Sequence, residues 1–267
     1  MKRFFSIAIV LALSVLALGA CGDPKPDDGG GQVDLKDLLF SNSEIKRNVT
    51  IQSTAMKQQM KYNVYLPPKF DENTAYPILY LLHGAGDDQG AWLDKGNAQK
   101  IADNYIKNQG GTPMIIVMPD AQMTFYVWNG FETYFHDELM PAVETKYKFS
   151  GKRAVAGLSM GGYGTLYHAL KYPSKFTYAY AMSPATDVGS FKAFIDAQAD
   201  KKVFPHFTIE VGTEDTTVNN ADAQTVADYM KTQGMTIEWI ARSGIHYWNF
   251  WQECLPKTLK KVGESFK

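Results

Sequence analysis

The sequence predicts an α/β fold: a mostly parallel central sheet, an antiparallel strand pair at its N-terminal side and helices on both faces. Short, mostly apolar runs alternate with stretches of helical character, which is typical of parallel strands buried on both faces. Two earlier runs alternate apolar and polar residues and end at Pro67-Pro68, as an antiparallel pair would. Residues 45–267 are enough for one α/β domain with a full core.

The pattern of apolar and polar residues predicts the position of each strand and helix. The antiparallel pair should be formed by residues 48–53 and 61–66. The buried strands are expected at residues 77–82, 114–118, 153–156, 177–182, 207–211 and 236–240. The helices are expected at residues 97–108, 134–147, 160–172, 191–199, 221–232 and 247–262. In such a sheet, ligands bind where the parallel strands end.

The chain begins with a pattern typical of a secretory signal. Lys2 and Arg3 precede an apolar run that is short for a membrane span of ~20 residues. The end of this run, Leu-Gly-Ala-Cys21, resembles a bacterial lipobox, so residues 1–20 are predicted to be a lipoprotein signal peptide and Cys21 the lipidated residue. The alternative is an ordinary signal peptide with Cys21 incidental. The prediction is an exported protein of the cell envelope, periplasmic or at the cell surface, held to a membrane by lipid alone.

Residues 21–44 should be a flexible tether, because the segment begins with a run rich in Pro, Gly and Asp. Loss of residues 1–20 would change the net charge from −1 to −3, with 25 Lys and Arg against 28 Asp and Glu. That balance gives no reason to expect a nucleic-acid partner. The sequence has no zinc-like Cys/His spacing, Walker A loop or GxGxxG, so no metal or other cofactor is expected.

A Gly157-x-Ser159-x-Gly161 motif lies between an expected strand and an expected helix. This context favours a nucleophile elbow, a sharp strand-to-helix turn with Ser159 at its apex. Side chains at 157 or 161 would collide with the neighbouring strand or helix, which explains the glycines. The motif alone is weak, since chance supplies it in roughly one chain in ten of this length.

Chain order strengthens the motif. A serine needs a neighbouring base, and in this architecture the order is serine, acid, histidine. His246 is the only histidine after Asp215, and each follows an expected strand. We therefore predict Ser159 as nucleophile, Asp215 as acid and His246 as base. Glu214 and Asp187 are alternative carboxylates for the acid.

An oxyanion site requires two backbone N–H donors. One should be the amide of Met160, directly after the nucleophile. The other is expected in the loop after residues 77–82, where Gly84 lets the backbone turn inward and the amide of Ala85 is the candidate. His83 is expected to order this loop.

Aromatic residues follow two of the expected strands. Trp128 and Trp248 are candidate substrate-binding residues, able to pack on a sugar face or an aromatic acyl group, with core packing as the alternative. Tyr247, Phe250 and Trp251 have i, i+3, i+4 spacing and are expected on one buried helix face.

The motifs LLHGAGDD, AGLSMGGYG, GTED and GIHYWNFW, in this order, resemble the putative-esterase (esterase D-like) family. The resemblance covers nearly the whole domain from about residue 46. It implies an α/β-hydrolase fold and the same roles for Ser159, Asp215, His246, Ala85 and Met160. It is closest to feruloyl and acetyl-xylan esterases of carbohydrate esterase family one.

The sequence therefore predicts an exported serine carboxylesterase that removes feruloyl or acetyl groups from plant cell-wall polysaccharide, such as xylan, through an acyl-enzyme. Its partner would be a small ester or an acylated oligosaccharide. The enzyme alternatives are a broad short-chain carboxylesterase and a siderophore esterase. Outside enzymes, the alternative is a glycan-binding lipoprotein that uses the same cleft.

Overall fold

The computed structural model describes residues 43–267. The expected signal peptide of residues 1–20, the lipidation site Cys21 and nearly all of the tether of residues 21–44 lie outside the described residues. The first strand begins at Glu44, one residue before the expected start of the domain.

The described residues form one eight-stranded sheet in the order β1-β2-β4-β3-β5-β6-β7-β8. The first three strands in this order pair antiparallel, and every further pair is parallel. The strands are β1 (Glu44–Ser53), β2 (Gln58–Leu66), β3 (Tyr76–Leu82), β4 (Ile115–Pro119), β5 (Phe149–Leu158), β6 (Tyr178–Met182), β7 (His206–Gly212) and β8 (Ile237–Arg242).

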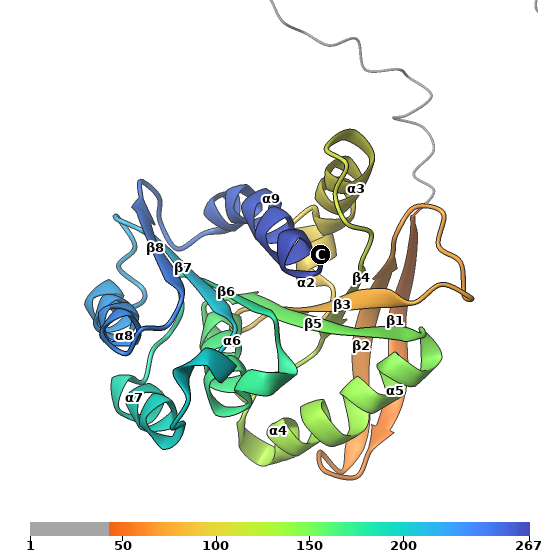
Figure 1. Ribbon diagram of the computed structural model, residues 1–267. Coiled ribbons are helices and arrows are strands. Elements are labelled where there is room, and N and C mark those ends of the chain that lie inside the picture. Colours follow the sequence, from red (N-terminus) through yellow and green to blue (C-terminus); the bar gives the residue numbers. More distant parts are fainter. Residues whose placement is uncertain (1–42) are drawn as a thin grey trace, which may run out of the picture. The chain divides into compact units, whose positions relative to one another are not determined.

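Helices cover both faces of the sheet (Figure 1). The α-helices are α2 (Ala91–Asp94), α3 (Ala98–Asn108), α4 (Phe131–Thr133), α5 (Met140–Lys146), α6 (Met160–Lys171), α7 (Val188–Ala197), α8 (Asn220–Thr232) and α9 (Trp248–Ser265). Short 3₁₀ turns are η1 (Trp128–Gly130), η3 (Pro173–Lys175) and η4 (Lys201–Val203), and η2 (Tyr134–Leu139) is a π-helical segment that continues into α5.

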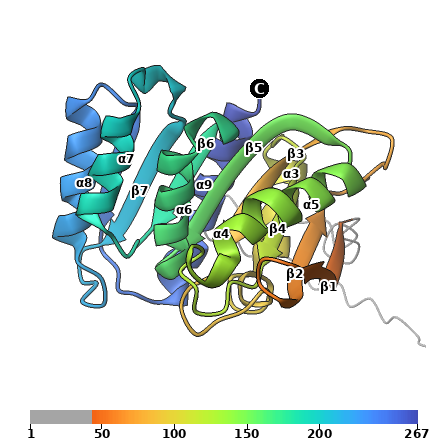
Figure 2. The same ribbon diagram turned by 90° about the horizontal axis from the view of Figure 1, so that it is seen from below.

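Each face of the sheet has its own apolar core. Helices α2, α3 and α9 pack on one face, over β-strand residues such as Leu79, Ala156 and Tyr180. Helices α4 to α8 lie on the opposite face, as Figure 2 shows from below, over Tyr80, Val155 and others. Residues of β3, β4 and β6 are almost completely buried, because both faces of these strands are covered.

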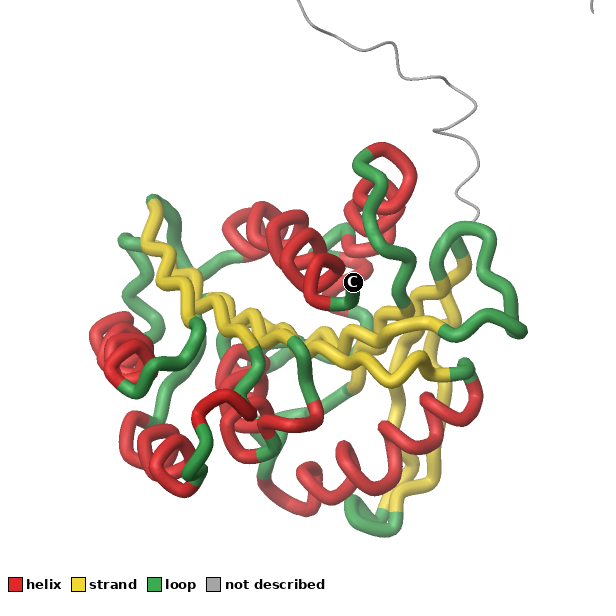
Figure 3. Tube along the Cα trace, viewed as in Figure 1, coloured by secondary structure: helices red, strands yellow, loops and turns green. Residues whose placement is uncertain are grey.

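The predicted α/β-hydrolase fold is confirmed, with an antiparallel N-terminal pair and a mostly parallel sheet between helices (Figure 3). Every expected strand and helix has a counterpart within a few residues. Helix α2 and the turns η1, η3 and η4 have no counterpart among the expected elements. They are only three or four residues long, too short to show a hydrophobic period.

Candidate active site

Ser159 occupies a sharp turn between β5 and α6. Its backbone has φ 53° and ψ −113°, a conformation that is costly for any residue with a side chain. Backbone hydrogen bonds fix the turn: the amide of Ser159 donates to Met182 at 2.9 Å, and its carbonyl accepts from Tyr163 and Ala185 at 3.0 and 3.2 Å. The structure therefore holds this serine at the carboxyl end of the sheet in a strained, well-braced turn.

The glycines of the motif are required by close approaches on both sides of the turn. A Cβ at Gly157 would lie 2.5 Å from the carbonyl oxygen of Gly161, and one at Gly161 would lie 2.5 Å from that of Leu82. Real Cβ atoms do not come so close to backbone atoms. A larger residue at either position would push α6 away from β3 and β5, in agreement with the collision expected from the motif.

The loop after β3 lies directly beside Ser159. A Cβ on Gly84 would be 3.6 Å from Cβ of Ser159, so the backbone before Ala85 passes next to the serine. Ala85 is exposed, and Met160 is the first residue of α6, where an amide has no partner within the helix. The two expected oxyanion donors thus lie on the two segments that flank the serine.

His83 orders this loop. Its buried ring donates from Nδ1 to the carbonyl of Gly84 at 2.7 Å and accepts at Nε2 from the amide of Ala121 at 3.0 Å. Burial lowers the pKa of His83, with the hydrogen bond to Gly84 opposing the shift only in part, so the ring stays neutral. A neutral ring is the form that can accept from Ala121.

Asp215 and His246 form a hydrogen bond of 2.7 Å between Oδ2 and Nδ1. A carboxylate only accepts, so Nδ1 of His246 carries a proton, and in the neutral tautomer with this bond Nε2 is the nitrogen with the lone pair. The other oxygen of Asp215 accepts from the amides of Thr217 and Val218 at 2.8 and 3.3 Å, and the carboxylate is fully buried. The acid is therefore fixed from two sides and orients the imidazole.

The other two carboxylates weighed for the acid have different partners. Glu214 accepts from the amide of Gly244 at 2.5 Å, so it pins the backbone of the histidine loop instead of the imidazole. Asp187 caps α7, accepting from the amide and the hydroxyl of Ser190 at 3.1 and 2.7 Å. Both have structural tasks that account for them.

Backbone contacts join the acid and histidine segments. The amide of Thr213 donates to the carbonyl of Arg242 at 2.8 Å, and that of Glu214 donates to Gly244 at 3.1 Å. Gly212 and Gly244 meet so closely that a Cβ on Gly212 would overlap the carbonyl of Gly244. This pairing continues the β7–β8 register past the strand ends and sets Asp215 opposite His246.

Ser159 and His246 are both half-buried. Among residues 43–267, no hydrogen bond joins the Ser159 hydroxyl to the imidazole, whereas the Asp215–His246 bond is formed. Nucleophile–base contacts are often long in a free enzyme and shorten when substrate binds.

One aromatic ring packs on the histidine, and others pack behind it. The imidazole of His246 packs edge-to-face on Trp251, with 4.9 Å between centroids, and Trp251 packs in the same way on Trp248. Trp248 also contacts Trp92 and is half-buried, so it belongs to an aromatic stack behind the base. The structure gives this candidate substrate-binding residue a packing role.

Tyr247 corrects the expectation of one buried helix face. Phe250 and Trp251 are buried, but Tyr247 is 62% exposed. Helix α9 begins only at Trp248, and Tyr247 has extended dihedrals of φ −150° and ψ 162°. Helical spacing therefore does not apply to it.

Trp128 is the first residue of η1 and is 53% exposed. It packs on Phe125 at 4.9 Å between centroids, and Phe125 packs on Tyr163 of the first turn of α6. Because Tyr163 also holds the carbonyl of Ser159, this aromatic group adjoins the serine turn. Of the two tryptophans, Trp128 has the face available for a ligand.

The segment that carries Trp128 is strained and clamped by side chains. Gln122, Phe125, Tyr126 and Asn129 all have positive φ. The hydroxyl of Tyr126 donates to the carbonyl of His83 at 3.1 Å, and its own carbonyl accepts from Nε2 of His168 at 3.0 Å. These buried bonds, which no local sequence pattern announced, hold the loop against α6.

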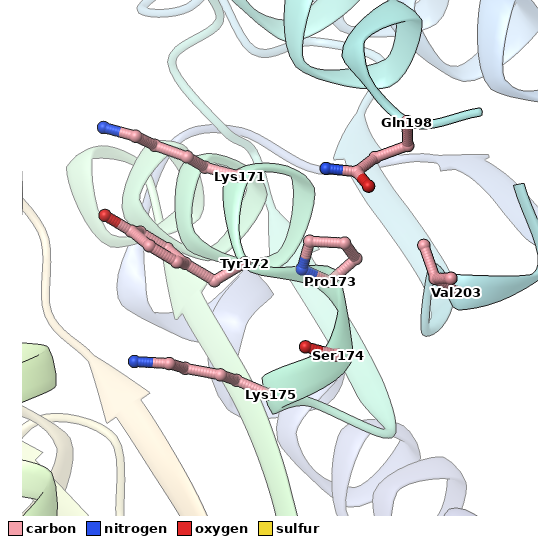
Figure 4. Close-up of a pocket in the computed structure, with 7 residues that line it drawn as sticks. All are labelled: Lys171, Tyr172, Pro173, Ser174, Lys175, Gln198 and Val203. Carbon is pink, nitrogen blue, oxygen red and sulfur yellow. The ribbon is translucent and has the colours of Figure 1, made fainter. Parts of the chain in front are cut away.

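A hollow of about 320 Å³ lies at the opposite end of α6, lined by Lys171, Tyr172, Pro173, Ser174, Lys175, Gln198 and Val203. The 12 residues of α6, about 18 Å long at a rise of about 1.5 Å per residue, separate this hollow from Ser159. In Figure 4 the amines of Lys171 and Lys175 extend away from Gln198 and Val203. They bond to Glu132 and His136, at 2.7 and 3.1 Å, so the hollow lacks the groups of a reactive site.

Within residues 43–267, no group of three or more His, Cys, Asp or Glu side chains is placed to hold a metal ion. In the same part of the chain, none of the helices has the length and apolar character needed to span a membrane.

The strained serine turn, the strand order and the Asp215–His246 bond define a protein of the α/β-hydrolase fold. A family profile described as "Putative esterase" matches residues 53–262, and the chain belongs to this family.

Similar proteins include feruloyl and ferulic acid esterases. An "Endo-1,4-beta-xylanase/feruloyl esterase" of Xylanibacter ruminicola is 29% identical over 244 residues, which cover 85% of this chain and 32% of that protein. A solved "ferulic acid esterase" has 25% identity and a TM-score of 0.77, over 85% of this chain and 100% of that one. The ferulic acid esterase of Anaeromyces mucronatus, solved with ferulic acid, shares the fold with a TM-score of 0.73 at 21% identity, over 91% and 97%. The chain spans about a third of the length of the curated relatives that it matches.

Proposed function

We propose that this protein is a serine carboxylesterase that removes feruloyl or acetyl groups from plant cell-wall polysaccharide. The observation that carries the proposal is the Asp215–His246 bond at the same sheet edge as a serine in a strained turn. Membership of the esterase family and the names of the similar proteins support the substrate class.

In the proposed mechanism, Nε2 of His246 takes the proton of Ser159 as the serine oxygen attacks the ester carbonyl. The buried carboxylate of Asp215 stabilises the imidazolium that forms. The amides of Ala85 and Met160 bind the oxyanion of the tetrahedral intermediate. The alcohol leaves with the proton from His246, which gives an acyl-enzyme, and water activated by the same imidazole then releases the acid.

We also propose export and attachment to the cell envelope through a lipid on Cys21. The support is the sequence pattern alone, a basic start and an apolar run that ends in a lipobox-like stretch. Cys21→Ala should release the protein from the membrane fraction, and unchanged membrane association would contradict lipid anchoring.

The test compares wild type and Ser159→Ala on p-nitrophenyl acetate, methyl ferulate and acetylated xylan. Wild type should hydrolyse the acetate and at least one cell-wall ester, and the variant should lose several orders of magnitude in turnover. Equal rates in the two proteins would reject the serine mechanism. Turnover of p-nitrophenyl acetate alone, with both cell-wall esters inert, would reject the substrate class.

A further inference from the structure

A fully buried carboxylate lies in β7, five residues before Asp215. Glu210 accepts hydrogen bonds from Tyr180 of β6, from Nε of Arg242 at the end of β8 at 2.5 Å, and from Lys257 of α9. Burial alone would raise the pKa of Glu210, but the bonds from Lys257, Tyr180 and Arg242 outweigh it and hold the pKa below its usual value. The carboxylate is therefore ionised and fully partnered.

Arg242 extends this cluster to the histidine segment. Its Nη2 donates to the carbonyl of Phe250 at 3.0 Å, its Nη1 pairs with Glu253 at 2.7 Å, and the guanidinium stacks on the Phe250 ring at 3.9 Å. Its own carbonyl accepts from Thr213 of the acid segment. One side chain thus joins the end of β7, the end of β8 and the first turn of α9.

His246 lies between the two points that Arg242 holds. Arg242 is four residues before it, and Phe250, also bound by Arg242, is four residues after it. Gly244, between Arg242 and His246, has φ +152° and lies so close to Phe250 that a Cβ would overlap the ring. The bond between Arg242 and Phe250 therefore fixes both ends of the segment that carries His246, and the conformation of this segment depends on the distance between those ends.

We propose that Glu210 and Arg242 are positioning residues, which hold the loop of residues 243–247 so that the imidazole of His246 faces both Asp215 and the Ser159 turn. Glu210 fixes the guanidinium from the strand side, and the guanidinium fixes the start of α9. This inference rests on the proposed function, since it assigns the base to His246.

The chain contains a matched control. Glu144 accepts from Nε and Nη2 of Arg153 and from the hydroxyl of Tyr80, the last at 3.2 Å. The Glu–Arg–Tyr bonds repeat those around Glu210, without a counterpart of Lys257, and the ion pair is mostly buried. This cluster, however, joins β3 and β5 to α5 and bonds to neither the acid nor the histidine segment.

The experiment measures kcat and KM on p-nitrophenyl acetate for wild type, Glu210→Gln, Arg242→Gln, Arg242→Lys and Glu144→Gln, at a temperature where each is folded by circular dichroism. Misplacing a catalytic group by about 1 Å costs on the order of a hundredfold, so Glu210→Gln and Arg242→Gln should lower kcat by about tenfold to a hundredfold, with KM nearly unchanged. Arg242→Lys keeps the charge and should recover part of the loss. Glu144→Gln should keep kcat within about twofold.

Two further measurements keep the test sharp. If the two residues act through one network, the double variant Glu210→Gln/Arg242→Gln should lose no more kcat than the more impaired of the two single variants. If Glu210→Gln does not fold, the loss in Arg242→Gln and its partial recovery in Arg242→Lys carry the same test. Wild-type kcat in both Arg242 variants, or an equal loss in Glu144→Gln, would overturn the positioning role. Failure of the proposed function would look different, because wild type itself would then match Ser159→Ala.

Discussion

The two sides of the Ser159 turn are held in different ways. On one side, backbone hydrogen bonds extend the β7–β8 pairing and place Asp215 opposite His246. On the other, the loop with Trp128 has several strained residues and is held by the side chains of His83 and His168. The catalytic pair thus rests on sheet register, with the Glu210–Arg242 bond as the proposed reinforcement, whereas the surface offered to substrate rests mainly on individual side-chain bonds. Substitutions should therefore alter turnover on the first side and substrate preference on the second.

The largest effect is expected at Asp215. Asp215→Asn should lower kcat by about 10⁴, because the amide no longer holds the imidazole in the tautomer that leaves Nε2 free. Glu214→Gln is the neighbouring control: it weakens the bond to the amide of Gly244 without touching the imidazole and should keep kcat within about tenfold. Steady-state kinetics on p-nitrophenyl acetate measure both, and an equal loss in both variants would contradict the assignment of Asp215.

Alanine substitutions of the two tryptophans should distinguish a residue that stabilises the fold from one that binds substrate. Trp248→Ala opens the stack with Trp92 and Trp251 and should lower the free energy of unfolding by about 2 kcal/mol, measured by urea denaturation. Trp128→Ala removes an exposed ring and should leave stability nearly unchanged while raising KM for methyl ferulate about twofold to tenfold. A stability loss at Trp128 without a change in KM would show that this ring, too, only packs.

The smallest effect concerns pH. Burial lowers the pKa of His136 to about 2 and that of His168 to about 3, so both stay neutral in the folded chain. The unfolded chain takes up these protons near pH 6.5, so the free energy of unfolding should fall as pH drops below that value, by about 1.4 kcal/mol per pH unit for each histidine. His136→Gln should reduce this slope between pH 6 and 5 by about 1.4 kcal/mol per pH unit, the contribution of one histidine.

His206, the first residue of β7, supplies the control for that slope, because its side chain is exposed to water in the folded chain, unlike those of His136 and His168. His206→Gln should leave the steep decline of stability unchanged. An equal slope in wild type and His136→Gln would contradict the neutral buried pair.

The sequence predicted the strands, the serine turn and the strand-end places of Asp215 and His246, because each depends on a short pattern and on chain order. It did not predict the cluster around Glu210, whose four members come from β6, β7, β8 and α9 and meet only through sheet register. A signal was present: Glu210 interrupts a strand expected to be buried on both faces. Tyr247 was misplaced because helical spacing was applied one residue before the helix begins.

The central claim, that Ser159 is the nucleophile, is tested most directly by covalent labelling with an organophosphonate and mass spectrometry. Trypsin should release residues 154–171, a peptide in which Ser159 is the only serine. This peptide should gain one phosphonyl group at Ser159, and the Ser159→Ala variant should stay unlabelled. Labelling at another residue, or equal labelling of the variant, would contradict it.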